Sequence, residues 1–470
     1  MSPKTPPTCA ISSAENIALL HLLHSVPTLP SSNPADIPTS RQNIYALSFK
    51  RERSLAGTLA FLSNIKDDPS HIPAVCVEEC KKSTRLNVVL AVNKATFEDG
   101  SQILREIKQG LEGIFDVLSR TDDTNLESDI FATIISVCSP RILCRLGIAR
   151  KKGGTLKTPI QPVLQKALDA IEQLNSHHSR KMSHVAQNFK ERAKEVIKLV
   201  DLWAKYRTTV GLGKLVEGIF YLWQLRELPT LLSAIPNRFM DPSSRRNLLN
   251  ITGKVARYRE AAKFLYSTAK KYPLVRKLNV VLANLPQEAF RSVANGKCTS
   301  TLHSTISRIS KGSSEQHIEH ISRVLGITRP EASEQFAEQM RKTQNESKIH
   351  AEIQLLFYTE SNYTNVPARV ICSSKDACFL CNAFILAHGK MHMPRHHGRL
   401  YPGWQLPFLP KLFNTEQQFN KVLESHIKLS LTALRSRRQK TIHPYPNEST
   451  LLTLPGSVST LQDGLPPVTK

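Results

Sequence analysis

Apolar residues recur at helical spacing along most of the chain before residue 276. A short helix is predicted at 13–24, and seven further segments follow in which apolar residues lie three and four positions apart: 54–65, 101–118, 129–143, 160–173, 183–207, 212–225 and 253–271. This spacing places the apolar side chains on one face of each helix, where they can pack against a neighbour. Residues 51–275 are therefore predicted to be a mainly α-helical region, whose role the pattern does not reveal.

The pattern becomes mixed after residue 276. A short apolar run predicts a strand at 277–285, whereas 299–309 fits a strand or a helix. The remaining predictions are helices at 315–325, 331–344, 348–360 and 377–387, strands at 366–372 and 390–393, and a last amphipathic helix from about 414 to 436. Helices and strands that alternate along the chain indicate an α/β domain, which we place at residues 276–436.

The two ends of the chain differ from this pattern. Residues 1–50 are rich in proline, serine and threonine, and residues 437–470 are basic and then rich in proline, so we predict partial disorder in the first segment and disorder in the second. No apolar run reaches membrane-spanning length, and the opening residues lack the basic segment and apolar core of a secretory signal. We therefore expect an intracellular protein, cytoplasmic or nuclear or both.

The charge of the chain favours an anionic partner. There are 63 lysines and arginines against 39 aspartates and glutamates, a formal net charge of +24. A nucleic acid or a nucleotide would satisfy this charge, and we predict no membrane partner. Much of the charge can equally belong to solvated helix surfaces, and the basic cluster at 435–440 fits either a nucleic-acid contact or a helix end whose dipole favours cations.

One group of residues has the composition of a metal site. His350 and Glu352 form an H-x-E triplet, and Cys378 and Cys381 form a C-x-x-C pair that begins 28 residues after the histidine. The triplet alone says little, because with 16 histidines one such triplet is expected by chance, and His317 begins a second one without paired cysteines. One imidazole and two thiolates can hold zinc and leave a fourth position open for water, and the carboxylate can then carry protons.

The predicted helices place these ligands suitably. Cysteines at positions i and i+3 in a first helical turn lie on one face, and the positive end of the helix dipole stabilises thiolates there. Two alternatives remain open: a closed structural zinc site, and dithiol redox chemistry at Cys378 and Cys381. Nearby residues that could supply a fourth ligand to a closed site are Cys372, His388, His392, His396 and His397.

The other cysteines do not suggest a second site. Cys76 and Cys80 are spaced for one face of a helix and are interpreted as buried thiols. The total of nine cysteines is odd, which favours reduced thiols over a disulfide framework.

Residues 350–381 resemble the H-x-E plus P-C-x-x-C signature of the cytidine/adenosine deaminase superfamily, with Ala377 where that family usually has proline. Over 345–410 the blocks HAEIQLLFY and RVICSSKDACFLCNAFILAHGKMHMPRHHGRLYPGW are more similar to the OTT-type deaminases, known mainly from fungal and bacterial toxin-like proteins. The resemblance implies a three-layer α/β/α cytidine-deaminase-like domain. It also implies zinc bound by His350, Cys378 and Cys381, with Glu352 as proton shuttle.

The segment directly after the cysteines has the composition of a substrate-facing loop. Residues 388–404 interleave histidines, basic residues and aromatic rings with glycine and proline. Cations there can meet a phosphate, and a ring can stack on a base. The candidate substrate-binding residues are Lys390, His392, Arg395, His397, Arg399, Tyr401 and Trp404. The alternative is a solvated loop whose Tyr401 and Trp404 cover the edge of the sheet.

The sequence therefore predicts a zinc-dependent hydrolytic deaminase acting on a cytosine or adenine base in a nucleotide or nucleic acid. Zinc-bound hydroxide would be the nucleophile, and Glu352 would move the protons. The main rival is a catalytically inactive deaminase-like zinc scaffold that serves as an interaction or nucleic-acid-binding protein. The redox site is a third and weaker hypothesis.

Overall fold

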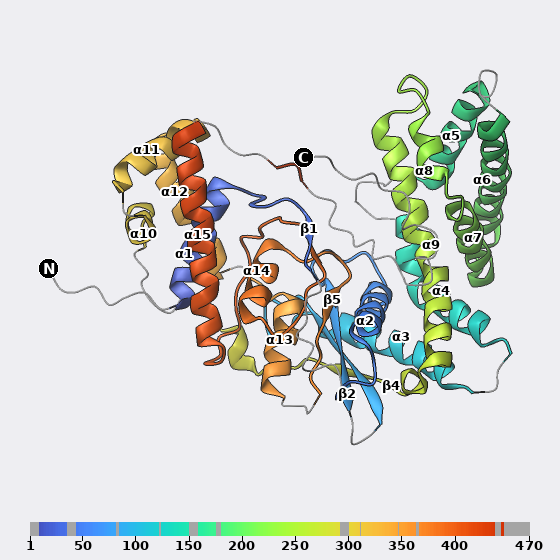
Figure 1. Ribbon diagram of the computed structural model, residues 1–470, viewed down its shortest axis with the longest axis horizontal. Helices are drawn as coiled ribbons and strands as arrows, with labels where there is room; N and C mark the ends of the chain where they lie inside the picture. The colour runs from blue at the N-terminus through green and yellow to red at the C-terminus, as the bar shows by residue number, and fades with distance from the viewer. Residues whose placement is uncertain are drawn as a thin grey trace. The chain divides into compact units, whose positions relative to one another are not determined.

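The structure is a computed structural model of the whole chain. It describes residues 9–34, 44–80, 84–121, 124–149, 158–174, 180–291, 300–310, 312–345, 347–362, 366–437 and 443–445. Within them the protein is mixed α/β and mostly helical, with a small sheet (Figure 1). No described helix is long and apolar enough to cross a membrane.

The chain forms two compact units. One combines Met1–Phe61, Pro69–Lys108 and Val280–Thr450, and it contains the predicted metal site. The other combines Leu62–Asp68, Gln109–Asn279 and Leu451–Lys470. Helix α3 (Ser101–Ser119) has residues in both.

The second unit is mainly helical where it is described, and its last two residues before Val280, Leu278 and Asn279, begin strand β4 (Leu278–Leu282). Its α-helices are α4 (Leu126–Arg145), α5 (Ile160–Leu174), α6 (Arg180–Tyr206), α7 (Thr209–Trp223), α8 (Leu228–Ser233) and α9 (Pro242–Lys271), followed by the 3-10 helix η3 (Pro273–Arg276). Helix α9 begins eleven residues earlier than the predicted 253. Asp241 caps it by accepting from the Ser244 N–H, and Pro242 stands in its first turn.

A four-stranded sheet lies in the first unit. Its strands are β2 (Pro73–Cys80), β3 (Arg85–Val92), β4 (Leu278–Leu282) and β5 (Ile371–Ser373), in the order β4-β3-β2-β5. Strand β2 is antiparallel to both neighbours, with Val75 opposite Leu90 on β3 and opposite Cys372 on β5. The sheet thus joins segments almost 300 residues apart along the chain.

Helices lie on both faces of this sheet. Helix α13 (Ala351–Ser361) packs on β2, β3 and β5, and Cys76 hydrogen-bonds to Thr359 within it. Alternate residues of β2 point to the opposite face. There Cys372, the cross-strand partner of Val75, bonds to the Arg53 carbonyl of α2 (Phe49–Ser63) at 3.8 Å.

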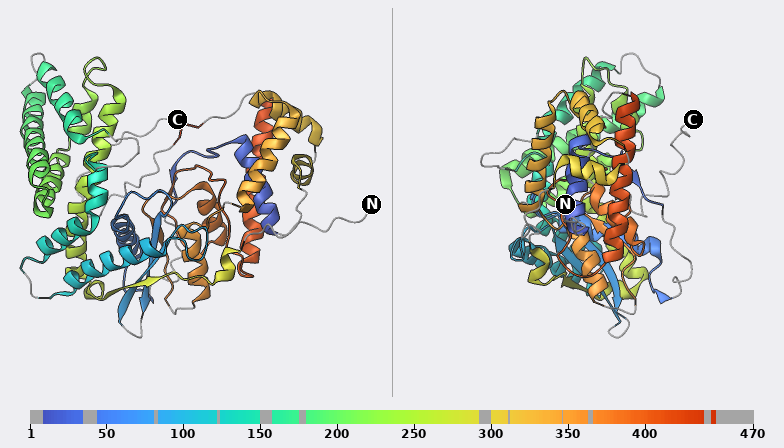
Figure 2. Two further views of the ribbon diagram at one scale, coloured as in Figure 1. Left: turned by 180° about the vertical axis from the view of Figure 1, so that it is seen from behind. Right: turned by 90° about the vertical axis from the view of Figure 1, so that its left-hand side faces the viewer.

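Helices from both ends of the chain pack beside the α13 layer. Helix α14 (Phe379–His388) contacts α13 and α15 (Phe413–Arg437), and α1 (Cys9–Leu23) lies between α15 and α12 (Arg329–Asn345) (Figures 1 and 2). Helices α10 (Leu302–Ile309) and α11 (Ser314–Leu325) complete this group, and the 3-10 helix η4 (Gln287–Phe290) precedes it. A two-stranded ribbon pairs β1 (Ser31–Ser32) with β6 (Arg395–His396).

The structure corrects several predictions. The two longest strands, β2 and β3, lie inside the region predicted to be mainly helical, so Cys76 and Cys80 belong to a strand and not to a helix face. Segment 299–309, which fitted a strand or a helix, contains helix α10. The strand predicted at 390–393 is reduced to a single bridge at His392.

The predicted disorder at the two ends lies partly outside the described residues. Residues 1–8, 35–43, 438–442 and 446–470 are not described. In the part that is described, residues 9–23 form helix α1, whose residues from Ser13 onward are mostly buried.

Candidate metal centre and its pocket

His350 stands immediately before helix α13, as its N-cap residue. The backbone of Ile349 exchanges two hydrogen bonds with Lys94 at the end of β3, at 2.8 and 3.1 Å. The Asn93 side chain accepts the Ala351 N–H at 2.9 Å, which satisfies one of the free donors at the helix start. The imidazole of His350 is therefore not required as a cap and can serve as a ligand.

Cys378 and Cys381 occupy the first turn of helix α14. Cys378 is its N-cap, and its sulfur accepts the backbone N–H of Cys381 at 3.3 Å. Just before them, Ala377 donates its N–H to the Arg395 carbonyl at 3.1 Å and accepts the His397 N–H at 2.9 Å. A proline at this position has no N–H to donate, so alanine is what allows this loop to be held against the site.

The three predicted zinc ligands come together in the core. The ligand atoms of His350, Cys378 and Cys381 lie within 4.8 Å of one another, and all three residues are buried. His350 Nδ1 is 3.4 Å from the Cys381 sulfur and 3.6 Å from the Cys378 sulfur. Tetrahedral zinc with bonds of about 2.3 Å to sulfur and about 2.0 Å to nitrogen separates such ligands by about 3.5 Å. The residues therefore fit a zinc ion.

The group is an open rather than a closed ligand set in the described part of the chain, since it contains no fourth protein ligand. Three of the five alternatives raised by the sequence are engaged elsewhere. His388 lies 3.1 Å from Glu360, His396 lies 2.7 Å from the Ser31 hydroxyl, and Cys372 contacts α2.

The carboxylate predicted as proton shuttle adjoins these ligands. Glu352 is 5 % exposed, and its Oε2 lies 3.7 Å from the Cys381 sulfur, the thiol donating. It sits in the first turn of α13, on the helix that His350 begins. A carboxylate there can reach a reacting group at the metal without itself being a ligand.

Burial and mutual contact shape the titration of this cluster. Burial raises the pKa of Cys378, but the hydrogen bond from Cys381 and the charge of His350 outweigh it, so the net pKa is far below the usual thiol value. Burial and the neighbouring Cys378 raise the pKa of Cys381. Burial lowers the pKa of His350, but its contact with Cys378 and the charge of Glu352 together outweigh burial, so the net pKa lies above the usual imidazole value. Metal binding must therefore displace protons from the cluster.

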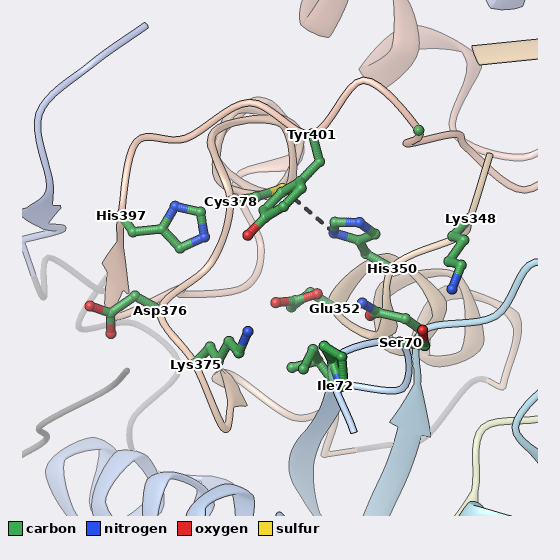
Figure 3. Close-up of a pocket in the computed structure, with 13 residues that line it drawn as sticks. Ser70, Ile72, Lys348, His350, Glu352, Lys375, Asp376, Cys378, His397 and Tyr401 are labelled. Carbon is green, nitrogen blue, oxygen red and sulfur yellow. Dashed lines mark hydrogen bonds between the residues drawn. The ribbon is translucent and has the colours of Figure 1, made fainter. Parts of the chain in front are cut away.

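A pocket of about 310 Å³ opens above the cluster (Figure 3). His350, Glu352 and Cys378 line it from the α13 and α14 side, and Ser70, Ile72 and Asn93 line it from the segments that flank β2 and β3. The remaining lining residues are Pro69, Lys348, Lys375, Asp376, His397, Tyr401 and Gly403. This volume is at the lower end of the range for a small-molecule site.

Two of the seven candidate substrate residues line this pocket. Tyr401 meets His350 edge to face at 5.8 Å between ring centroids and meets His397 at the same separation. His397 Nδ1 accepts the Arg399 N–H at 3.1 Å, so in the neutral ring Nε2 carries the proton. Figure 3 shows both side chains on the same side of the pocket.

The other five candidates do not line it. Lys390 pairs with Glu360 at 3.0 Å on the surface, and His392 packs on Phe49. Arg395 lies 3.5 Å from Asp376, the guanidinium of Arg399 lies over the Tyr401 ring at 4.9 Å, and Trp404 is buried in the core at 1 % exposure.

Sequence reasoning missed several pocket residues. Lys348 and Lys375 are close to the motif residues and could have been found from that proximity and their charge. Ser70, Ile72 and Asn93 precede the motif by more than 250 residues and carry no signal of their own. The pairing of β2 with β5 and the bridge between Lys94 and Ile349 bring them to the site.

Comparison with known proteins supports the same assignment. Residues 349–408 match the family described as OTT_1508-like deaminase. No curated protein and no solved structure matched the chain. The matched segment begins one residue before His350 and includes Glu352, Cys378, Cys381 and Tyr401. The chain therefore carries a cytidine deaminase-like domain that includes residues 349–408.

Proposed function

We propose that this protein is a zinc-dependent hydrolytic deaminase that acts on a cytosine or adenine base in a nucleotide or nucleic acid. The observation that carries the proposal is the buried His350, Cys378 and Cys381 cluster, with Glu352 beside it and a pocket above it. The helices on both faces of the sheet support the three-layer α/β/α fold that the sequence predicts for this domain.

The reaction requires water to add to the ring carbon that bears the amino group, after which the carbon–nitrogen bond breaks and ammonia leaves. Zinc, when bound, supplies a Lewis acid that makes water a nucleophile near neutral pH. Glu352 takes the proton from that water and delivers protons to the ring nitrogen and to the departing amine. Its burial beside the ligands keeps competing solvent away from these transfers.

The pocket wall suggests how such a substrate is held. The Tyr401 ring offers a face or edge for a base, and the Nε2–H of His397 offers a hydrogen bond to a ring or carbonyl acceptor. Lys348 and Lys375 place positive charge at the pocket, where a phosphate of a nucleotide or of a nucleic-acid backbone can bind. We propose these four residues as the substrate-binding set, together with Asn93.

The first test combines metal analysis with an ammonia-release screen over nucleosides, nucleotides and single-stranded oligonucleotides. We expect about one zinc per chain in the wild type. The Cys378→Ser variant should lose the metal, because one of three ligands is removed. A wild-type protein without zinc would contradict the proposal.

Glu352→Gln separates the enzyme from a zinc scaffold. We expect the variant to keep its zinc and its fold and to lose turnover by at least about 100-fold, because the amide cannot carry protons. If the protein is a scaffold, Glu352→Gln should leave its binding to partners unchanged. His350→Ala tests the redox hypothesis, since a dithiol site would largely tolerate it.

A further inference from the structure

Trp404 is held against the metal centre. Its side chain is 1 % exposed, and its indole N–H donates a hydrogen bond to the Cys381 sulfur at 3.3 Å. An indole has one donor and no acceptor, so this bond uses the whole hydrogen-bonding capacity of the ring. The donor of this buried tryptophan is therefore committed to a zinc ligand.

The ring is fixed on several sides. Lys348, two residues before His350, donates its N–H to the Gly403 carbonyl at 2.9 Å and accepts the Gln405 N–H at 3.1 Å, so the backbone on both sides of Trp404 is bonded to the entry of α13. The ring packs on Phe384 of α14 and on Phe419 of α15, with centroids 6.4 and 5.4 Å away. The N–H is thus oriented before any metal binds.

Apart from the His350 imidazole, each of the two sulfurs accepts one N–H from the described residues. The Cys378 sulfur accepts the backbone N–H of Cys381, and the Cys381 sulfur accepts the Trp404 indole. Cys381 also lies 3.7 Å from the Glu352 carboxylate. In a buried site a hydrogen-bond donor spreads the negative charge of a thiolate and reduces its repulsion with a nearby carboxylate.

We propose that Trp404 is a positioning residue of the metal centre, which orients the Cys381 sulfur and withdraws negative charge from it through the indole N–H. The proposal rests on the zinc site of the proposed function and is independent of the substrate. Weaker electron donation from sulfur leaves a bound metal more acidic, and residues that bond to metal ligands typically change metal affinity or activity by about 10–100-fold.

The test uses the full chain loaded with cobalt(II), whose sulfur-to-metal charge-transfer band reports directly on the thiolates. Trp404→Phe removes the N–H and keeps an aromatic ring. Replacement of Trp404 by 3-benzothienylalanine removes only the N–H and keeps the size of the ring system, so it decides the question if the phenylalanine variant fails to fold. We expect the band to move to longer wavelength in both and zinc affinity to fall about 10-fold.

Phe419→Leu is the matched packing control. Phe419 lies 5.4 Å from both Trp404 and Phe384, and it makes no hydrogen bond to a ligand. The control should therefore leave the band in place even if it lowers the melting temperature. An unchanged band in the Trp404 variants, or an equal change in the control, overturns this proposal alone. A wild-type protein that binds no cobalt overturns the zinc centre as well.

Discussion

At the residue scale, a buried carboxyl group next to the α13 layer affects stability. Glu78 on β2 is 4 % exposed, and its Oε1 is buried and has no hydrogen-bond partner among the residues that the structure describes. It points to the same face of the sheet as Cys76, toward α13. Burial raises the pKa of Glu78 to about 7. The folded protein therefore holds this proton at pH values where the unfolded chain has released it.

This gives a pH-dependent prediction. Between the ordinary glutamate pKa near 4.5 and about 7, the unfolded state binds fewer protons at Glu78 than the folded state, so stability falls as pH rises through this window. The unfolding free energy of the Glu78→Gln variant should therefore decrease by up to about 3 kcal/mol less over this pH window than that of the wild type. Urea unfolding of both proteins at pH 5 and pH 8 measures the difference, and parallel pH dependences would contradict it.

Glu79 provides the contrast. It faces the other side of the sheet, where its two carboxylate oxygens accept the Ala46 and Leu47 N–H groups at 2.7 and 2.8 Å. Glu79→Gln removes one of these acceptors and should destabilise the protein by about 1 kcal/mol or more at both pH values.

At the element scale, the segment between α1 and α2 holds the loop that carries His397 and Tyr401. Ser25 accepts the Leu400 N–H at 3.0 Å, Asn33 donates to the Pro394 carbonyl at 3.0 Å, and β1 pairs with β6. The two segments also meet at Gly398, which has a φ of +74° and lies so close to the Thr28 carbonyl that an added Cβ would overlap it. Only glycine allows this approach.

Gly398→Ala should loosen this contact. The added Cβ collides with the Thr28 backbone, and the left-handed conformation strains alanine by about 1–2 kcal/mol. Gly326→Ala is the matched control, because Gly326 has a φ of +67° but open space around its Cα. We expect Gly398→Ala to cost a further ~1–3 kcal/mol in unfolding free energy and to raise KM. Equal effects of the two substitutions would contradict the close contact.

At the scale of the whole molecule, the deaminase-like unit is discontinuous in sequence. Its central strand β2 and its neighbour β3 precede the metal motif by more than 250 residues, and helix α1 near the start packs against α15 near the end. The second compact unit contributes Gln109–Asn279 between these parts. The predicted domain of residues 276–436 therefore lacks the strand on which β5 and α13 are built.

A fragment of residues 276–437 tests this organisation. Without β2, β3 and α1 it leaves the apolar face of α13 uncovered and one edge of β5 unpaired, so it should not fold cooperatively or bind zinc. Circular dichroism melting and zinc stoichiometry, with the full chain as control, measure this. A fragment that binds one zinc and melts cooperatively would contradict it.

The helices were largely predictable because their signal is local. Each helix predicted in 51–275 is present, although α9 begins earlier, because apolar spacing of three and four residues needs no knowledge of distant contacts. Strands β2 and β3 were missed because both faces of β2 are buried, so its residues do not alternate between apolar and polar. Cys76 and Cys80 then fitted a helix spacing that the structure does not contain.

The candidate metal cluster could be predicted from the sequence, whereas most of the residues that surround it could not. His350, Glu352, Cys378 and Cys381 could be recognised from the sequence because zinc chemistry demands particular residue types at short spacings around helix starts. The position of Trp404 could not be recognised in this way, because the composition of its loop fits a substrate-facing segment. Its packing against Phe384 and Phe419 in the folded protein places it in the core.

The sequence by itself thus determined most of the helices, the candidate ligand set and the deaminase resemblance, since each depends on residue types at short separations. The tertiary structure decided which strands carry the site, which of the seven candidate loop residues reach the pocket, and which donors hold the ligands. These depend on contacts between segments up to about 400 residues apart, and pairing over such separations is selected by burial and register across the whole unit.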